Sequence, residues 1–223
     1  MRHLAFIMDG NKRWGEKNKK SQIESYKIGL NKLFDITNFC IDNKIPFISA
    51  YAMSSENFLR PSINLIYDVI SSEFDNIVIK LANDKRIKIN FIGEIERLPK
   101  KILSQLKKIS LMTKKNKVIT LNIIMNYSSE EEIVNIINKI LNNNYVNKQI
   151  KKKDLNEFLY LKDMPEPDLL IRTGGFQRLS NFLLIYLKYT ELFFTKTLWP
   201  DLKNSELLSI IENYNKIKKN YGL

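Results

Sequence analysis

Histidine and cysteine are almost absent from this chain. Its 223 residues include one histidine, His3, and one cysteine, Cys40. A single cysteine excludes a disulfide within the chain and fits a reducing compartment. A zinc site built from these ligands, or a Ser-His-Asp triad, is also hard to assemble from so few residues. His3 opens the first apolar run, so we interpret it as the start of a strand rather than as a catalytic base.

Glycine, proline and long apolar runs are also scarce. Seven glycines and six prolines leave no segment that resembles a linker. No apolar run approaches the roughly 20 residues of a membrane span, and the first run begins at once, without the pattern of a signal peptide. Because 44% of the residues are hydrophobic, the chain can bury a sizeable core. We expect one domain over residues 1–223.

Acidic residues are outnumbered by basic ones, 24 against 36, which gives a net charge of +12. Such a balance suits an anionic partner, whether nucleic acid, acidic lipid or a phosphorylated substrate. Most of the charge is lysine in helical patterns, however, and solvated helix faces explain it. Only seven of the 36 basic residues are arginines, so the positions of the arginines are more informative.

Short apolar runs alternate with helical periods along the chain. Six runs predict buried strands: Leu4–Met8, Phe47–Met53, Ile87–Ile92, Val118–Met125, Leu169–Ile171 and Glu191–Phe194. Helical patterns lie between and after them, at 21–43, 63–77, 99–115, 133–140, 154–161, 181–188 and 204–219. Ser129 and Glu132 predict a capping box at the start of one helix. This alternation predicts an α/β fold with a six-stranded, mostly parallel sheet covered by helices.

Three polar segments follow predicted strands. They begin at Asp9, after the first strand, and cover 51–61 and 171–182, after the second and fifth. Each alone is explained as an ordinary connection with turn residues. Open parallel sheets bind ligands outside the carboxyl ends of their strands, so three such segments together indicate a site at one edge of the sheet.

Arginine and glycine are concentrated in these segments. They hold four of the seven arginines and three of the seven glycines: Arg13, Arg60, Arg172 and Arg178, with Gly10, Gly174 and Gly175. The planar guanidinium binds phosphate in a bidentate manner that lysine cannot reproduce, and glycine lets backbone amides approach an anion. Neither of the common glycine-rich phosphate motifs is present. The pattern predicts a phosphate site of another kind.

Asp9 is the acid among these groups. Beside arginines that bind a diphosphate, a carboxylate suits a Mg²⁺ ligand, since this ion takes one or two carboxylates plus phosphate oxygens. A helix cap or an ion pair with Arg13 is the alternative. Trp14 and Phe58 either face a substrate or pack in the core. Four polar residues either bind a polar substrate or form a helix cap: Ser54, Ser55, Glu56 and Asn57.

Long stretches of the chain resemble the cis-prenyltransferases, and bacterial undecaprenyl diphosphate synthases most of all. The resemblance extends from His3 to about Tyr221. It is carried by five ordered motifs: HLAFIMDGNKRW, YAMSSENFLRP, LNIIMNY, PDLLIRTGG and RLSNFLLIYLKYTELFFTKTLWPD.

The resemblance implies a Mg²⁺-dependent homodimer that adds isopentenyl diphosphate repeatedly to an allylic diphosphate, commonly farnesyl diphosphate. The implied product is a polyprenyl diphosphate such as undecaprenyl diphosphate, the precursor of the lipid carrier for cell-wall synthesis. Asp9 and Glu191 match metal ligands, and Asp9 also assists the allylic diphosphate. Asn57 matches a residue assigned to proton removal; because an amide is a poor base, we give it a positioning role.

The substrate-binding positions are carried over in the same way. Those on the allylic side and the neighbouring substrate loop are Gly10, Asn11, Lys12, Arg13, Trp14, Gln22, Tyr26, Ser54, Ser55, Glu56, Phe58 and Arg60. Those of the isopentenyl diphosphate site are Arg172, Arg178, Leu179 and Ser180.

Several residues depart from the pattern of the family. Gln22 replaces an arginine that usually contacts the allylic diphosphate, and Tyr26 replaces a histidine. Phe58 stands for a frequent tryptophan, while Phe176 and Gln177 stand for a frequent glutamate and a polar residue or histidine. Gln22 removes a charge from a diphosphate site and is expected to weaken binding of the starter substrate.

The long apolar product implies an apolar tunnel lined by the Ile- and Leu-rich helices. It also suggests a cytoplasmic protein that works at the membrane surface without spanning it. Two alternatives are a non-catalytic scaffold subunit of the same fold and a basic nucleic-acid-binding module. Retention of Asp9 weighs against the first. The second predicts exposed aromatic residues interleaved with bases, whereas most aromatics here fall within apolar patterns, so we expect no nucleic-acid partner.

Overall fold

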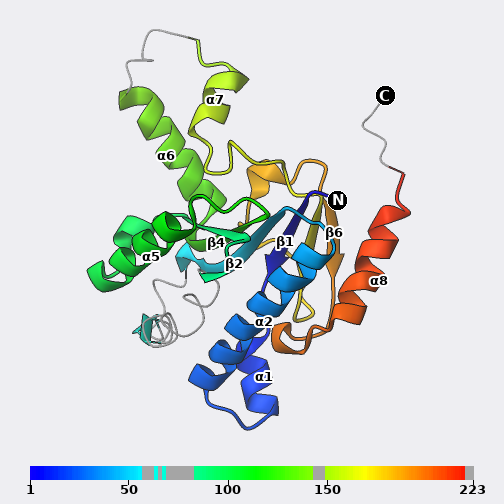
Figure 1. The fold of residues 1–223 in the computed structure, drawn as a ribbon. Coiled ribbons are helices and arrows are strands. Elements are labelled where there is room, and N and C mark those ends of the chain that lie inside the picture. Colours follow the sequence, from blue (N-terminus) through cyan, green and yellow to red (C-terminus); the bar gives the residue numbers. More distant parts are fainter. Residues whose placement is uncertain (57–62, 65–66, 69–82, 143–148, 219–223) are drawn as a thin grey trace.

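Six parallel strands form one sheet at the centre of the protein (Figure 1). The computed structural model describes residues 1–56, 63–64, 67–68, 83–142 and 149–218. The strands are β1 (His3–Ile7), β2 (Phe47–Ser54), β3 (Ile87–Ile92), β4 (Ile119–Tyr127), β5 (Leu169–Arg172) and β6 (Glu191–Phe194). Every predicted strand is therefore confirmed to within two residues at each end, and all pairings are parallel.

The strand order is β3-β4-β2-β1-β5-β6. The chain first builds the half of the sheet on one side of β1 and then crosses to the other side. Ile7, the last residue of β1, is aligned with Tyr51 of β2 and with Arg172 of β5. The order of the strands reverses at β1, and in open parallel sheets such a point opens a crevice at the carboxyl ends of the strands.

Helices connect these strands, and their local sequences explain several of their ends. The α-helices are α1 (Asn11–Lys17), α2 (Gln22–Asp42), α5 (Lys100–Thr113), α6 (Ser129–Asn142), α7 (Lys152–Phe158) and α8 (Asn204–Asn215), with short 3₁₀ helices η3 (Ile95–Arg97), η5 (Leu184–Tyr186) and η6 (Trp199–Asp201). Ser21 and Glu24 form a capping box at the start of α2. In the described part of the chain, no helix is both long and apolar enough to cross a membrane.

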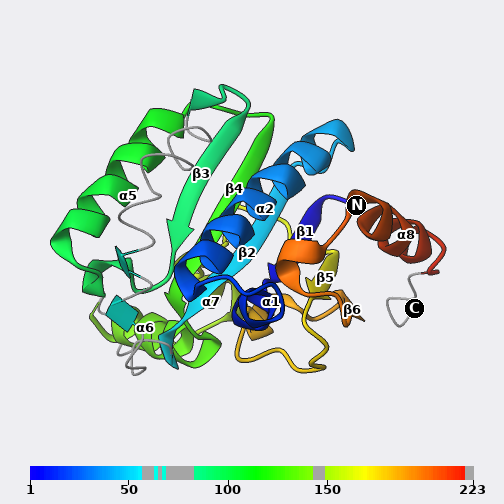
Figure 2. The same cartoon turned by 90° about the horizontal axis from the view of Figure 1, so that it is seen from below.

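The two faces of the sheet are covered differently. One face packs against α2, α5 and α8, which lie along the sheet in Figure 2, and Leu33, Ile102 and Leu207 represent these helices in its buried cluster. The other face packs against segments 159–164 and 179–187, and its buried cluster includes Phe182 and Tyr186. Both faces of the parallel strands are thus buried, which explains why the strand sequences are almost continuously apolar.

Four expectations about local structure need correction or lie outside the described residues. The polar segment after β1 is not only loop, because α1 begins at Asn11. The helix expected at 181–188 is reduced to η5. Ser128, not Ser129, caps α6, since its hydroxyl accepts from the Glu131 N–H. Most of the helical pattern at 63–77, and with it much of the expected wall of an apolar tunnel, falls outside the described residues.

His3 is buried at the start of β1, as the sequence predicts, and its ring joins two other parts of the chain. Nδ1 lies 2.7 Å from the Pro165 carbonyl oxygen and Nε2 lies 2.8 Å from the Ser49 hydroxyl. Burial lowers the pKa of His3 from 6.5 to about 4, although the Pro165 carbonyl and Asp168 act in the opposite direction. The ring is therefore neutral near pH 7, and its role is structural.

This pKa predicts a loss of stability in weak acid. Between pH 6.5 and 4 the unfolded chain binds a proton at His3 and the folded chain does not, so stability falls as the pH falls through this window. The loss reaches about 3 kcal/mol. Urea unfolding from pH 7.5 to 4 should show a shallower decline in His3→Gln, which keeps polar atoms at this position. Parallel declines in both proteins would contradict the assignment to His3.

Candidate active site

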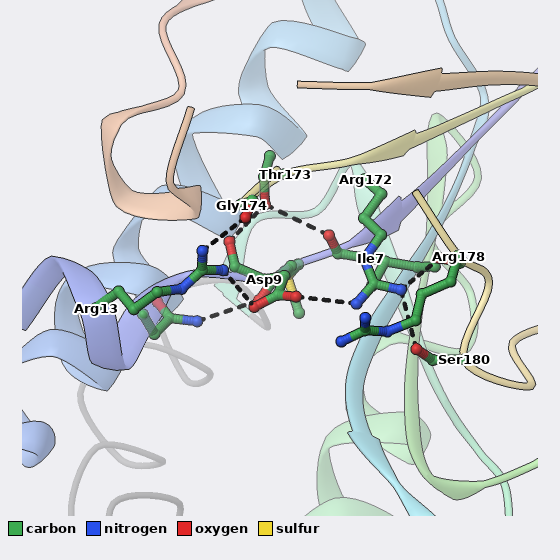
Figure 3. Close-up of polar contacts among 10 residues, drawn as sticks. Ile7, Asp9, Arg13, Arg172, Thr173, Gly174, Arg178 and Ser180 are labelled. Carbon is green, nitrogen blue, oxygen red and sulfur yellow. Dashed lines mark hydrogen bonds and ion pairs between the residues drawn. The ribbon is translucent and has the colours of Figure 1, made fainter. Parts of the chain in front are cut away.

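The carboxyl ends of β1 and β5 bring together an aspartate and an arginine that are far apart in the sequence. Asp9 follows β1 by two residues, and Arg172 is the last residue of β5. Arg172 donates from Nη2 to Asp9 Oδ2 at 2.9 Å. Figure 3 shows this pair at the centre of a cluster of polar side chains. The aspartate therefore lies at the crevice where parallel sheets bind ligands.

A second arginine approaches Asp9 from α1. Gly10 precedes this helix with a φ of 114°, a conformation that suits glycine. The turn places Arg13 so that its Nη2 donates to Asp9 Oδ1 at 3.1 Å and its Nη1 donates to the Gly174 carbonyl at 2.7 Å. A Cβ atom at Gly174 would lie 2.6 Å from Nη2 of Arg13, so this approach requires glycine there. Asp9 is thus held between two guanidinium groups (Figure 3).

The backbone of Asp9 is fixed as firmly as its side chain. Its carbonyl oxygen accepts from the Thr173 hydroxyl at 2.8 Å and from the Trp199 N–H at 3.1 Å. Trp14 on α1 donates from its indole nitrogen to the Asp201 carboxylate at 2.6 Å. These bonds tie the segments after β1, β5 and β6 together, so the site is organised before any ligand binds.

The two arginines predicted for isopentenyl diphosphate have different environments. Arg172 is 3% exposed and donates from Nη1 to the Ser180 hydroxyl at 2.9 Å and to the Arg178 carbonyl oxygen. Its Nε is buried and has no hydrogen-bond partner among the described residues. Arg178 is exposed. Arg172 thus holds Asp9 and the loop of Ser180, whereas the Arg178 side chain is exposed, and the roles of both arginines toward isopentenyl diphosphate stay predictions.

Comparison with known proteins points to the same protein family as the sequence motifs. Residues 7–222 match the family model described as "Putative undecaprenyl diphosphate synthase". The chain belongs to the undecaprenyl diphosphate synthase family. The resemblance to cis-prenyltransferases and the prediction of a prenyltransferase-type enzyme are thereby confirmed.

Individual members of the undecaprenyl diphosphate synthase family match over nearly the full length. The chain is 36% identical to the isoprenyl transferase of Rickettsia typhi over 224 residues, covering 100% of this chain and 98% of the relative. It is 35% identical to a tritrans,polycis-undecaprenyl-diphosphate synthase (geranylgeranyl-diphosphate specific) of Pyrococcus furiosus, covering 99% of this chain and 86% of the relative. The crystal structure of lavandulyl diphosphate synthase from Lavandula x intermedia with dimethylallyl diphosphate superposes with a TM-score of 0.91 at 26% identity, covering 100% and 98% of the two chains.

The other predicted residues on α1 and α2 differ in their burial and in their contacts with this cluster. The Asn11 amide donates to the Met8 carbonyl, and its Oδ1 is buried with no hydrogen-bond partner in the part of the chain that the structure describes. Lys12 is exposed and forms an ion pair with Glu16. Gln22 and Tyr26 are half-buried in the first two turns of α2, and in the described part of the chain no hydrogen bond joins their side chains to Asp9. Their roles in substrate binding stay predictions.

The substrate loop after β2 is described only at its beginning. Ser54 ends β2, and Ser55 and Glu56 form a short helical turn after it. Asn57, Phe58 and Arg60 lie outside the described residues, so the predictions for them stay untested. On the other side, Leu179 packs against the buried cluster that includes Phe182, and its role in substrate binding stays a prediction.

Glu191, the second predicted metal ligand, is not close to Asp9 within one chain. It is the first residue of β6 and is aligned with Leu169, the first residue of β5, whereas Asp9 lies beyond the last aligned pair of strand residues. At about 3.3 Å per residue, this places Glu191 about 10 Å or more toward the amino end of the sheet. Asp9 and Glu191 of the same chain therefore do not meet, and the role of Glu191 as a second metal ligand stays a prediction.

The donor set at Asp9 fits Mg²⁺ that arrives with a phosphate. The Asp9 side chain is 27% exposed, and each carboxylate oxygen accepts one guanidinium hydrogen bond and retains a further lone pair. Among the described residues, no three His, Cys, Asp or Glu side chains are grouped to hold an ion. Mg²⁺ commonly takes one or two carboxylates and completes its shell with substrate phosphates and water, so Asp9 would be its protein ligand here.

Two residues of the site were missed in the sequence. The Tyr51 hydroxyl donates to the Tyr127 carbonyl at 2.7 Å, and its ring stacks on Phe182 at 4.4 Å, which fixes the ends of β2 and β4 beside the loop of Ser180. Burial, and then the charge of Glu56, raise the pKa of Tyr51, so it is a neutral donor. Tyr51 lies within an apolar strand, and nothing in the sequence of that strand indicates that its hydroxyl joins two other segments. Thr173, whose hydroxyl holds Asp9, does lie within the RTGG motif.

Proposed function

We propose that this chain catalyses cis-prenyl chain elongation, adding isopentenyl diphosphate repeatedly to an allylic diphosphate. In each step a bond forms between the terminal carbon of the isopentenyl group and C1 of the allylic group. The bond from C1 to the diphosphate oxygen breaks, diphosphate leaves, and the isopentenyl unit loses a proton. The observation that carries the proposal is the Asp9 carboxylate held between Arg13 and Arg172 beside the exposed Arg178.

The described residues have separate tasks in this reaction. Arg13, exposed on α1, donates hydrogen bonds to the diphosphate of the allylic substrate as its charge develops, and Arg178 binds that of isopentenyl diphosphate. Arg172 orients Asp9. Mg²⁺ bound at Asp9 would supply further neutralisation of the leaving diphosphate. Because these groups are fixed by Thr173, Trp199 and Gly174 before substrate binds, little reorganisation opposes the reaction.

The starter and the product are proposed as farnesyl diphosphate and undecaprenyl diphosphate. Relatives differ in this respect, since one is named for geranylgeranyl diphosphate and another was crystallised with dimethylallyl diphosphate. We further propose that the chain acts as a homodimer in the cytoplasm and releases its amphipathic product at the membrane surface, where the product serves cell-wall synthesis.

The test is an elongation assay on the isolated chain. Labelled isopentenyl diphosphate is supplied with dimethylallyl, farnesyl or geranylgeranyl diphosphate, with Mg²⁺ or with excess chelator, and the products are separated by chromatography. We expect Mg²⁺-dependent polyprenyl products with farnesyl diphosphate as the best starter. The competing hypothesis, a non-catalytic scaffold subunit, predicts no product from any starter. Full activity in chelator would refute the metal requirement.

A further inference from the structure

One exposed aromatic ring lies among three guanidinium groups of the site. Phe176 follows the Gly174–Gly175 turn and is 41% exposed. The guanidinium carbon of Arg178 lies 4.1 Å from the centre of the ring, that of Arg13 lies 4.9 Å from it, and that of Arg172 lies 5.8 Å from it. All three distances are within the range of cation–π attraction.

The charges around this ring do not balance. The three arginines carry three positive charges, and Asp9 is the carboxylate that pairs with Arg13 and Arg172. In the described part of the chain, Arg178 takes part in no ion pair. Like charges this close repel one another, and Asp9 and the Gly174 carbonyl hold Arg13 in place, so something must hold the exposed Arg178 side chain beside it. The electron-rich face of the ring can do so without cancelling their charge.

We propose that Phe176 is a positioning residue that gathers Arg13, Arg172 and Arg178 into one diphosphate-binding cluster and leaves its excess positive charge for the substrate. This rests on the proposed function, because it assigns a ligand class, diphosphate, to the same site. A carboxylate at position 176 would compensate the arginines internally and compete with the diphosphate. An aliphatic side chain would keep the volume but lose the attraction for the guanidinium groups.

Four substitutions of Phe176 separate these effects. Phe176→Leu removes the aromatic face and keeps an apolar side chain, with Phe176→Met as a second variant of the same kind. Phe176→Tyr keeps the face. Phe176→Glu adds a competing carboxylate. Tyr189→Leu is the matched control, because Tyr189 is an aromatic residue that is 60% exposed and precedes β6 at the opposite end of the strands from Asp9.

The measurement is calorimetric binding of inorganic pyrophosphate to the full chain in metal-free buffer, followed by steady-state kinetics with isopentenyl diphosphate. We expect Phe176→Leu and Phe176→Met to weaken pyrophosphate binding about 3- to 10-fold and to raise KM for isopentenyl diphosphate more than they lower kcat. Phe176→Tyr should restore binding to within about 2-fold of wild type. Phe176→Glu should weaken binding at least about 10-fold. Thermal midpoints should stay close to wild type throughout.

Three results would overturn the proposal: wild-type binding in both aliphatic variants, tighter binding in Phe176→Glu, or an equal loss in Tyr189→Leu. Each of these leaves the proposed function intact, because the wild-type chain would still bind pyrophosphate. If the wild-type chain itself bound no pyrophosphate, the diphosphate site would fail and the role of Phe176 would fail with it.

Discussion

Replacing Asp9 with asparagine is expected to lower kcat for elongation by about 10²- to 10³-fold, the usual effect of removing one preorganised electrostatic group. The carboxylate accepts hydrogen bonds from two guanidinium groups. Among the described residues it is also the side chain that we propose as the ligand of Mg²⁺ at the diphosphate. The amide of asparagine has one oxygen for these tasks and is a much weaker ligand for a hard cation. Asp9→Ala should be at least as inactive, and it also leaves the buried Arg172 without its partner.

The assay must separate lost chemistry from lost folding. Asp9→Asn keeps the size and one acceptor, so its circular dichroism spectrum and thermal midpoint should stay near those of wild type. Asp35→Asn is a matched control, because Asp35 is an exposed aspartate of α2 that pairs only with Lys32 among the recorded ion pairs of the described residues. Near-wild-type turnover in Asp9→Asn would show that this carboxylate is not part of the reaction.

The largest effect on stability is expected at Glu132, which is 1% exposed. Its carboxylate accepts hydrogen bonds from the hydroxyls of Tyr127 and Tyr186 and from the Tyr160 N–H. Glu132→Ala removes this acceptor from the buried Tyr186 hydroxyl and from the partly buried Tyr160 N–H, and it leaves the Tyr127 hydroxyl only the Ser129 hydroxyl at 3.3 Å. Each unsatisfied buried donor costs roughly 1–3 kcal/mol. We expect the free energy of unfolding to fall by about 3 kcal/mol or more, which lowers the thermal midpoint by roughly 6–12 °C in a chain of this size.

Glu130→Ala is the control for this experiment, since Glu130 lies in the same first turn of α6 but is exposed. Its effect should stay below about 1 kcal/mol. Glu132→Gln, which retains one oxygen acceptor, should lie between the two. Equal midpoints for the two alanine variants would mean that the buried carboxylate contributes no more than a surface one. Burial and the charge of Glu132 raise the pKa of both Tyr127 and Tyr186, so both stay donors over the usual pH range.

The sequence predicts the strands of this protein better than its short helices. A strand buried on both faces is a continuous apolar run, and all six runs appear as strands. Helix α1 has seven residues, most of them polar, and shows no apolar periodicity, so its segment was interpreted as loop. Segment 181–188 has apolar residues at helical spacing, yet Ser180, Asn181 and Leu183 have positive φ values that prevent a regular helix.

The sequence predicts which arginines and which aspartate form the candidate site, but not which of them are buried or which of them pair. Arginine is scarce in the chain, so its positions predict Arg13, Arg172 and Arg178 as residues of one site. The guanidinium groups of all three lie near the ring of Phe176. Which guanidinium is buried depends on strand order and packing, which no local pattern contains, so the sequence does not distinguish the buried Arg172 from the exposed Arg178. The place of Glu191 at the amino end of β6 likewise follows from the alignment of β5 with β6 and not from its local sequence. The spacing of Ser129 and Glu132 predicts a capping box, but Glu132 is buried against tyrosines, and Tyr160 and Tyr186 are distant from it in sequence.

The position of β1 between β2 and β5 also has a consequence for biosynthesis. β1 emerges first from the ribosome, but Leu4 pairs with Leu169 on one of its edges. At about 5–20 residues per second, that edge waits roughly 10–30 s for its neighbour. Asp9 acquires Arg172 only then, and Trp199 later still. The nascent chain therefore carries an apolar strand with one unpaired edge for most of its synthesis, which makes it a natural client of chaperones that shield exposed strand edges until translation ends.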